Sequence, residues 1–299
     1  MRYALLARLT ALAALLSLAA PPARAASPLP WTDPDGKPLP FATEQELLEF
    51  LRTAEVKKQK ELGEGINHPT KLLLEKDGVR VNAVFRDVDV EKATATFEHS
   101  RGEIGFRDSY LFEPAAYELC RLLGYDNVPP ATLRRLGSKG GSVQVWVENA
   151  MTETKHLKDK VETPDLTRWN KQVQMMNVFD ALIANTDRNR GNMLITADWK
   201  IWWIDHTRAF RRNKVLLKPE GLRQCERGFL QRLRTLDEAA VRARLKDYLR
   251  KAEIDAVLVR RKVIVEQIDK LIAEQGEARV LYNYEGPEAA APAATPAAD

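Results

Sequence analysis

Hydrophobic and polar positions change their spacing near Met151. Before this residue, short runs of β-branched and other apolar side chains alternate with turn residues. Asp77-Gly78 between two such runs is a strong signal for a β-hairpin, and a second hairpin is predicted around a glycine-rich turn. After Met151, apolar side chains recur at helical spacing through 169–185 and 219–274. The chain is therefore predicted to be α+β, with a β-rich N-terminal part and a helical C-terminal part.

Two helices are predicted within the β-rich part. The first covers 43–61, with Thr43 as N-cap and Glu46 as its capping-box partner. The second covers 113–124, with a proline in its first turn and a glycine at its end. The stretch 87–112 has no period that predicts a regular element.

The first 25 residues are typical of a cleaved secretory signal peptide. Their apolar run, Leu9–Ala20, carries no charge, and Ala23-Arg24-Ala25 is a small-x-small cleavage site. A membrane anchor is the alternative, but the run is shorter than the roughly 20 residues that span a bilayer. We therefore expect an exported protein, periplasmic or extracellular after cleavage, without a transmembrane anchor.

These patterns divide the chain into five segments. The expected order is a signal peptide at 1–25, a linker and N-terminal helix at 26–62, a β-rich lobe at 63–150, a helical lobe at 151–284 and a low-complexity, disordered tail at 285–299.

The charge of the chain gives no support to nucleic-acid binding. The formal net charge is +4, and it falls to +1 without Arg2, Arg8 and Arg24 of the signal peptide. The four histidines have no metal-ligand spacing, so zinc is not expected. Cys120 and Cys225 could pair in an exported protein or remain buried thiols, and both readings stay open.

The chemistry of the chain is concentrated in a polar loop and the apolar strand that follows it. Asp187 and Asn192 lie in the loop, and Asp205 ends the strand. An aspartate that orients a hydroxyl, together with an asparagine and an aspartate that hold magnesium, forms the acidic half of a phosphoryl-transfer site. In the alternative interpretation, Asp187 and Asn192 only cap and turn the loop.

A complementary basic half is predicted in the β-rich part. Backbone N–H groups of the glycine-bearing loop 63–67 could approach phosphate oxygens, although a plain turn is the common alternative. Arg86 ends a predicted strand and could neutralise phosphates, or it could be a solvated arginine. Glu113 or Glu118 of the second helix could pair with it.

These residues resemble a family of atypical kinases. The segment Asn185–Asn192, followed by an apolar run that ends Ile-Asp-His at His206, is similar to the catalytic and metal-binding loops of phosphatidylinositol 3- and 4-kinases, HipA-like kinases and secreted Golgi casein kinases. The resemblance covers roughly 60–275 and implies a two-lobed protein-kinase-like fold in an exported bacterial member of this group.

The resemblance also implies a role for each matching residue. Asp187 is the expected catalytic aspartate, Asn192 and Asp205 are the expected metal ligands, and Arg86 and Glu113 complete the catalytic set. The residues expected to bind the nucleotide are Gly63, Gly65, Asn67, Arg86, Trp146, Val147 and Glu148.

Three positions depart from the family pattern. Arg86 stands where the family usually has lysine, and Lys71 is the fallback cation. Asn189 stands where a histidine is common, and His206-Thr207 stands where Phe-Gly or a similar pair is usual.

The predicted function is transfer of the ATP γ-phosphoryl group to a hydroxyl of a protein, a lipid headgroup or a small molecule, with Mg²⁺ or Mn²⁺. The alternative is a catalytically weak or inactive pseudokinase that acts as a nucleotide-binding or scaffold protein of the cell envelope. Two features motivate this alternative, namely Arg86 and export to a compartment where ATP is expected to be scarce.

Overall fold

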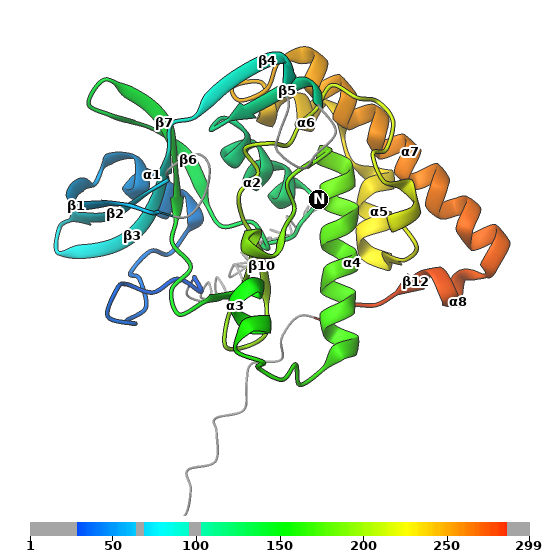
Figure 1. Cartoon of the computed structure of the whole chain (residues 1–299), viewed down its shortest axis with the longest axis horizontal. Helices are drawn as coiled ribbons and strands as arrows, with labels where there is room; N and C mark the ends of the chain where they lie inside the picture. Colours follow the sequence, from blue (N-terminus) through cyan, green and yellow to red (C-terminus); the bar gives the residue numbers. More distant parts are fainter. Residues whose placement is uncertain (1–28, 64–68, 96–102, 286–299) are drawn as a thin grey trace, which may run out of the picture.

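The computed structural model describes residues 29–63, 69–95 and 103–285. Its N-terminal part is built around an antiparallel sheet and its C-terminal part is mainly helical (Figure 1), which confirms the predicted α+β class. The predicted signal peptide and the tail from Gly286 onward lie outside the described residues. Among the described helices, none is long and apolar enough to cross a membrane.

The N-terminal lobe contains a five-stranded antiparallel sheet with the strand order β1-β2-β3-β7-β6. Asp77 and Gly78 both have positive φ, at 51° and 77°, in the tight turn of the predicted first hairpin. The second hairpin is also present. The strands are β1 Glu55–Glu61, β2 Thr70–Lys76, β3 Val79–Arg86, β6 Ala131–Leu136 and β7 Lys139–Val145.

The helix predicted over 43–61 is wrong in its second half. Helix α1 covers Glu44–Thr53 and begins with the predicted capping box of Thr43 and Glu46, but the chain continues as β1 and pairs with β2. Nearly every residue from Glu55 to Glu61 is polar, so no apolar stripe holds this segment in a helix. The sheet edge instead satisfies its backbone hydrogen bonds.

Helix α2, Phe112–Leu122, lies at the predicted place and is almost completely buried. The predicted glycine, Gly124, has φ 73° just after the helix end, as a left-handed C-terminal cap requires. Cys120 of this helix and Cys225 are both buried and free, and burial raises the pKa of each thiol to about 12.

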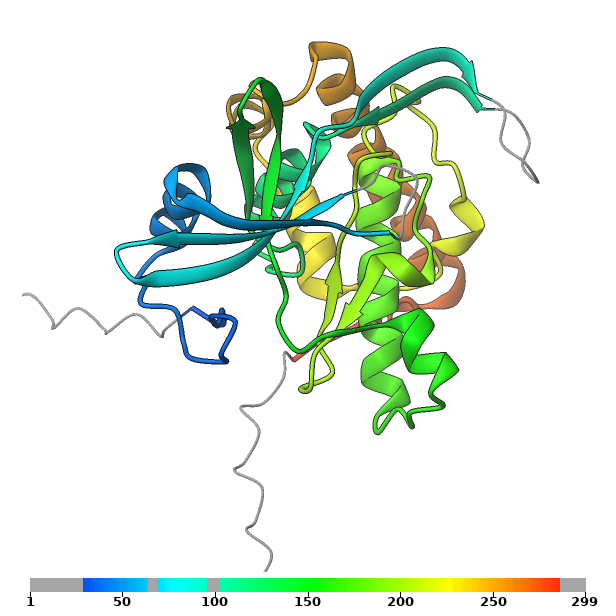
Figure 2. The same ribbon diagram turned by 60° about the vertical axis from the view of Figure 1, so that its left-hand side comes forward.

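A two-stranded sheet without a sequence signal lies between β3 and α2. Its strands are β4 Asp89–Ala95 and β5 Glu103–Ser109. The side chains of β4 are exposed except at Ala95. This hairpin extends away from the main sheet over the C-terminal lobe (Figure 2).

The C-terminal lobe is assembled around helix α4, which packs against α7. The region predicted to be helical from Pro219 begins as helix only at Arg227, after a short 3-10 turn and a strand. The elements of this lobe are β8 Met151–Thr152, α3 Glu153–Lys158, α4 Leu166–Ile183, η1 Arg190–Asn192, β9 Met193–Ile195, β10 Ile201–Trp203, η2 Pro219–Gly221, β11 Cys225–Glu226, α5 Arg227–Thr235, α6 Glu238–Leu245, α7 Lys251–Gln275, α8 Glu277–Val280 and β12 Leu281–Tyr282.

Candidate active site

Asparagine side chains fold the loop that follows α4. Ala184 ends the helix with φ 49°. The Oδ1 atom of Asn185 then accepts the N–H of Asp187 at 3.0 Å, and Oδ1 of Asn189 accepts the N–H of Gly191 at 2.8 Å. Local side-chain contacts of this kind are the turn chemistry that asparagine favours. Asn189, which departs from the family pattern, therefore has a structural role in the loop.

Asn192 is tied to the expected catalytic residue. Its Nδ2 donates to the carbonyl oxygen of Asp187 at 2.9 Å, and the residue is buried. This bond fixes the orientation of the side-chain amide of Asn192. The amide Oδ1, a possible oxygen ligand for a metal, therefore points away from the carbonyl oxygen of Asp187.

Arg188 connects the loop to the strand that carries Asp205. It donates to both carboxylate oxygens of Asp180 on α4, at 2.8 and 3.0 Å, and to the carbonyl oxygens of Asn192 and Ile204. One guanidinium group therefore holds α4, the loop and the end of β10 together. Sequence analysis assigned no role to Arg188 or Asp180, because Arg188 lies beyond the end of α4 and no local pattern places it beside Asp180.

Asp205 follows the buried strand β10 in a left-handed backbone conformation, with φ 59°. This conformation costs about 1 kcal/mol or more for a residue with a Cβ, and such strain is common at functional sites. The hydroxyl of Thr207 donates to Asp205 Oδ1 at 3.2 Å.

Arg86 lies close to two of the acids of the predicted site, Glu113 and Asp205. Its Nε is 3.8 Å from Glu113 Oε1 and 4.0 Å from Asp205 Oδ1. Its Nη1 is buried and makes no hydrogen bond to the part of the chain that the structure describes. A buried guanidinium N–H without a partner is costly, so a phosphate oxygen suits this position.

Glu113 is fully buried beneath the strand end. It accepts the backbone N–H of His206 at 2.8 Å, and Nε2 of Gln144 lies 3.5 Å from its second oxygen. Burial by itself would raise the pKa of Glu113, but Arg86 and His206 hold it below its ordinary value.

The imidazole of His206 bridges Glu113 and Arg188. Nη2 of Arg188 lies 3.1 Å from Nε2, and Oε2 of Glu113 lies 3.5 Å from Nδ1. Because arginine can only donate, Nε2 is the acceptor of this contact. His206, which sequence analysis treated only as a departure from the family pattern, therefore lies between α2 and the loop that carries Asp187.

Asp187 is partly exposed and close to other charges. Nη1 of Arg208 lies 3.5 Å from its Oδ1. Partial burial raises the pKa of Asp187; Arg208 opposes this change, whereas Asp205 and Asp108 reinforce it.

The segment Trp146–Glu148 connects the two lobes, as a hinge would. The N–H of Trp146 donates to the carbonyl oxygen of Asn82 at 2.9 Å, and Nδ2 of Asn82 donates to Glu148 at 2.7 Å. Val147 is buried. Lys71 lies with Nζ 4.0 Å from the ring centre of Trp146, so Arg86 rather than this fallback cation accompanies Glu113.

The predicted phosphate loop is only partly described. Gly65 and Asn67 lie outside the described residues. At Gly63 a Cβ would meet nothing within 4 Å, so close packing does not require glycine there.

The side-chain oxygens of the predicted site suit a hard cation such as Mg²⁺, which also binds water and phosphate oxygens. The described residues contain no group of three or more histidine, cysteine, aspartate or glutamate side chains placed to hold a metal. Asn192 and Asp205 offer two oxygen ligands, and Mg²⁺ commonly combines such ligands with water and phosphate oxygens. The backbone of Ile204, next to Asp205, donates to the carbonyl oxygen of Asn192 at 3.3 Å, which keeps the two segments adjacent.

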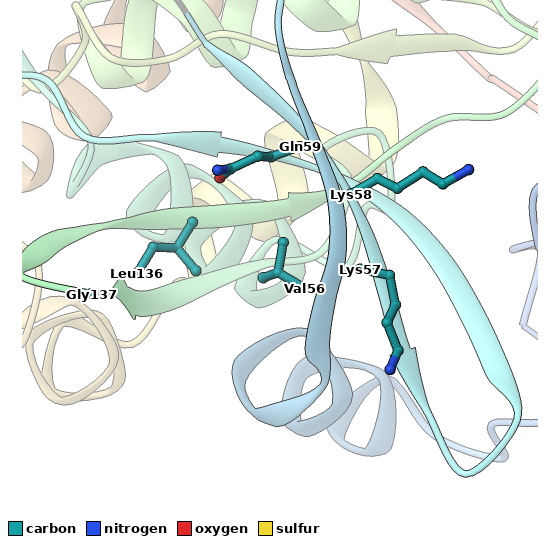
Figure 3. A pocket seen from close by; sticks show the side chains of 6 residues that line it. All are labelled: Val56, Lys57, Lys58, Gln59, Leu136 and Gly137. Atoms are coloured by element: carbon teal, nitrogen blue, oxygen red, sulfur yellow. The ribbon is translucent and has the colours of Figure 1, made fainter.

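A cavity of about 490 Å³ lies elsewhere in the N-terminal lobe. Figure 3 shows its lining residues on β1 and at the β6–β7 turn. None of its lining residues belongs to the predicted site, so this cavity is not the predicted nucleotide site. The lining residues are Val56, Lys57, Lys58, Gln59, Leu136 and Gly137.

No protein-family model and no curated protein matches the sequence. Solved structures do match the fold. A hydra Fam20 structure with sugar has a TM-score of 0.64 at 14% identity and covers 80% of this chain and 92% of its own. A Golgi casein kinase with Mn/ADP bound has a TM-score of 0.62 at 18% identity and covers 82% of this chain and 80% of its own. A further Golgi casein kinase structure has a TM-score of 0.61 at 19% identity, with the same coverage.

These similarities show that the chain has a kinase-like fold. They confirm that the fold is kinase-like, as the predicted resemblance to secreted Golgi casein kinases implies. The specific likeness to phosphatidylinositol kinases and HipA-like kinases stays a prediction.

Proposed function

We propose that this protein is a kinase-like phosphotransferase that moves the ATP γ-phosphoryl group to a hydroxyl acceptor. One observation carries the proposal: the hydrogen bonds of Arg188 join the loop of Asp187 and Asn192 to the strand end of Asp205. The Nε atom of Arg86 lies 4.0 Å from Asp205 Oδ1. Acidic ligands facing a cation are what phosphoryl transfer needs, because positioning and charge stabilisation supply most of its catalysis.

Each residue has a defined task in this proposal. Asn192 and Asp205 would hold Mg²⁺ or Mn²⁺, which when bound offsets negative charge on the phosphates. Arg86 would donate to a phosphate oxygen through Nη1, which has no hydrogen-bond partner among the described residues, while Glu113 and Asp205 hold the guanidinium in place. Asp187 would accept the hydrogen bond of the acceptor hydroxyl and orient its oxygen towards the phosphorus.

The similar Golgi casein kinase structure with Mn/ADP bound supports a nucleotide and a divalent cation as cofactors. We propose Trp146, Val147 and Glu148 as the wall against the base, and the loop of Gly63, Gly65 and Asn67 as the cover over the phosphates. The acceptor class remains a protein, a lipid headgroup or a small molecule. Export is likewise proposed from the first 25 residues alone.

A nucleotide-binding scaffold is the second candidate. The observation that favours it is the forked guanidinium of Arg86 in the place of a lysine, since the two groups present different donor geometry to phosphates. A scaffold would retain binding of the nucleotide through Arg86 and Asp205 but would transfer no phosphate.

Two measurements on the chain from residue 26 onward test the proposal. Thermal unfolding with and without Mg·ATP reports binding, since a ligand of the native state raises the unfolding temperature. Incubation of the protein with labelled ATP and an envelope extract reports transfer, which is measured as label incorporated into the extract. We expect Asp205→Ala to lose both, and Asp187→Asn to keep the thermal shift while transfer falls about 10²–10⁴-fold.

Asp159→Asn serves as the matched control, because this exposed aspartate just after α3 pairs only with Lys155 among the contacts described for its side chain. It should change neither measurement. Binding without transfer by the wild-type protein would favour the scaffold, and absence of both would refute the nucleotide site.

A further inference from the structure

Arg208 contacts the proposed catalytic carboxylate from the segment that follows Asp205. Its Nη1 is 3.5 Å from Asp187 Oδ1. The side chain of Arg208 is 12% exposed, whereas that of Asp187 is 36% exposed. The arginine is therefore held within the protein, and the aspartate keeps a side open to an approaching acceptor.

The backbone around Arg208 is fixed beside the catalytic loop. Its carbonyl oxygen accepts the N–H of Thr186 at 3.4 Å and the hydroxyl of Thr186 at 3.1 Å. Two residues further on, Phe210 has φ 53° and donates its N–H to the carbonyl oxygen of Ile183. The backbone of Arg208 is thus attached to the residue that precedes Asp187, which fixes the point from which its side chain extends towards the carboxylate.

The β4–β5 hairpin supplies a wall for the guanidinium. The Cζ atom of Arg208 lies 5.4 Å from the ring centre of Phe106 on β5, within reach of a cation–π interaction. The same strand carries Asp108, which with Asp205 adds negative charge near Asp187. Arg208 is therefore the cation that offsets this repulsion and gives the carboxylate a preferred direction.

We propose that Arg208 is a positioning residue that holds Asp187 in the orientation in which it receives the acceptor hydroxyl. This inference rests on the proposed phosphotransfer. The ion pair engages Oδ1, so an acceptor can use the other oxygen, and a small error in the direction of the carboxylate lowers turnover steeply.

The test compares kinetics of Arg208→Ala, Arg208→Lys and wild type. We expect Arg208→Ala to lower kcat about 100-fold, with KM for ATP and the Mg·ATP thermal shift unchanged, because the arginine acts on Asp187 and not on the nucleotide. Arg208→Lys keeps the charge and should restore part of the loss. In the Asp187→Asn background, removal of Arg208 should have no further effect.

Arg212→Ala is the matched control: it lies in the same segment, is 51% exposed and pairs with Glu91. Its kcat should equal that of wild type. An unchanged kcat in Arg208→Ala, an equal loss of nucleotide binding, or the same loss in the Asp187→Asn background would each overturn this inference while the proposed function stands. Absence of transfer by the wild-type protein would overturn the proposed function, and this inference with it.

Discussion

At the scale of single residues, Glu113 is the most constrained group in the site. It is fully buried, with the backbone of His206 on one carboxylate oxygen and the imidazole of the same residue 3.5 Å from the other. Arg86 adds a positive charge at 3.8 Å. The carboxylate is therefore ionised despite its burial, and its charge in turn stabilises the buried guanidinium.

This arrangement predicts a pH-dependent loss of stability. The pKa of Glu113 is lowered from its ordinary value of 4.5 in the folded state, so the stabilisation is present above this value and disappears as pH falls towards the lower folded pKa. We expect Glu113→Gln to cost about 3 kcal/mol at pH 7, because it removes the closer and fully buried carboxylate from Arg86 and leaves only Asp205 beside the buried guanidinium. Urea unfolding should show this difference from wild type shrinking below pH 4.5.

Glu118 on the same helix provides the control. It pairs with Arg244, whose side chain is 56% exposed, whereas that of Glu118 is 14% exposed, and burial raises the pKa of Glu118. Its replacement by glutamine should cost about 1 kcal/mol or less, as expected for a solvent-screened pair. A Glu113→Gln difference that stays constant from pH 7 to pH 3 would show that charge does not explain the role of this residue.

At the scale of elements, the β4–β5 hairpin joins the end of the N-terminal sheet to the C-terminal lobe. Arg107 of β5 forms a buried ion pair with Glu253 at the start of α7, and Glu91 of β4 pairs with Arg250 and Arg212 at the surface. The N–H of Ser109 also donates to the carbonyl oxygen of Thr207 at 2.8 Å. The hairpin therefore holds the segment after Asp205 through a backbone hydrogen bond and a surface ion pair.

The two ion pairs between hairpin and helix should differ strongly in their contributions to stability. Glu253 is 1% exposed and Arg107 9%, so Glu253→Gln leaves a buried charge and should cost about 3 kcal/mol. Glu91 is 46% exposed, and Glu91→Gln should cost about 1 kcal/mol or less. Glutamine at position 253 can still accept the N–H of Arg250, so the cap of α7 is preserved. Equal costs in urea unfolding would contradict this comparison.

At the scale of the whole molecule, the irregular segment before α1 contacts both lobes. Trp31 packs against Trp202 of β10 with ring centres 4.8 Å apart, and Asp35 forms an ion pair with Arg80 of β3. Leu39 is buried in the same core. The segment predicted to be a linker thus stabilises the relation between the sheet and the helical lobe.

Removal of the Trp31 side chain should destabilise the protein as a whole. Trp31 is 5% exposed, and truncation of a buried tryptophan to alanine costs about 3–5 kcal/mol through lost burial and the cavity that remains. Trp31→Phe should recover most of this loss, because it retains an aromatic contact with Trp202. Thermal or urea unfolding measures both variants, and a loss below 1 kcal/mol in Trp31→Ala would show that the segment is dispensable for stability.

The sequence alone was sufficient for features that depend on near neighbours in the chain. The Asp77-Gly78 turn, the Thr43 capping box and the helix of Glu113 follow from backbone preferences and hydrogen bonds within a few residues. The spacing of the loop with Asp187 also identified a compact group of polar residues. These local energies do not depend on the rest of the fold, so they could be predicted.

Only the tertiary structure decided which distant residues these local elements contact. Glu55–Glu61 became a strand because β2 offered backbone partners, against the helical prediction. The contacts of Arg188 with the strand end and of Arg208 with Asp187 span 16 and 21 positions, and that of His206 with Glu113 spans 93. Pairing over such separations depends on how elements pack and on which buried charges must be neutralised, and neither is encoded in the spacing of any one segment.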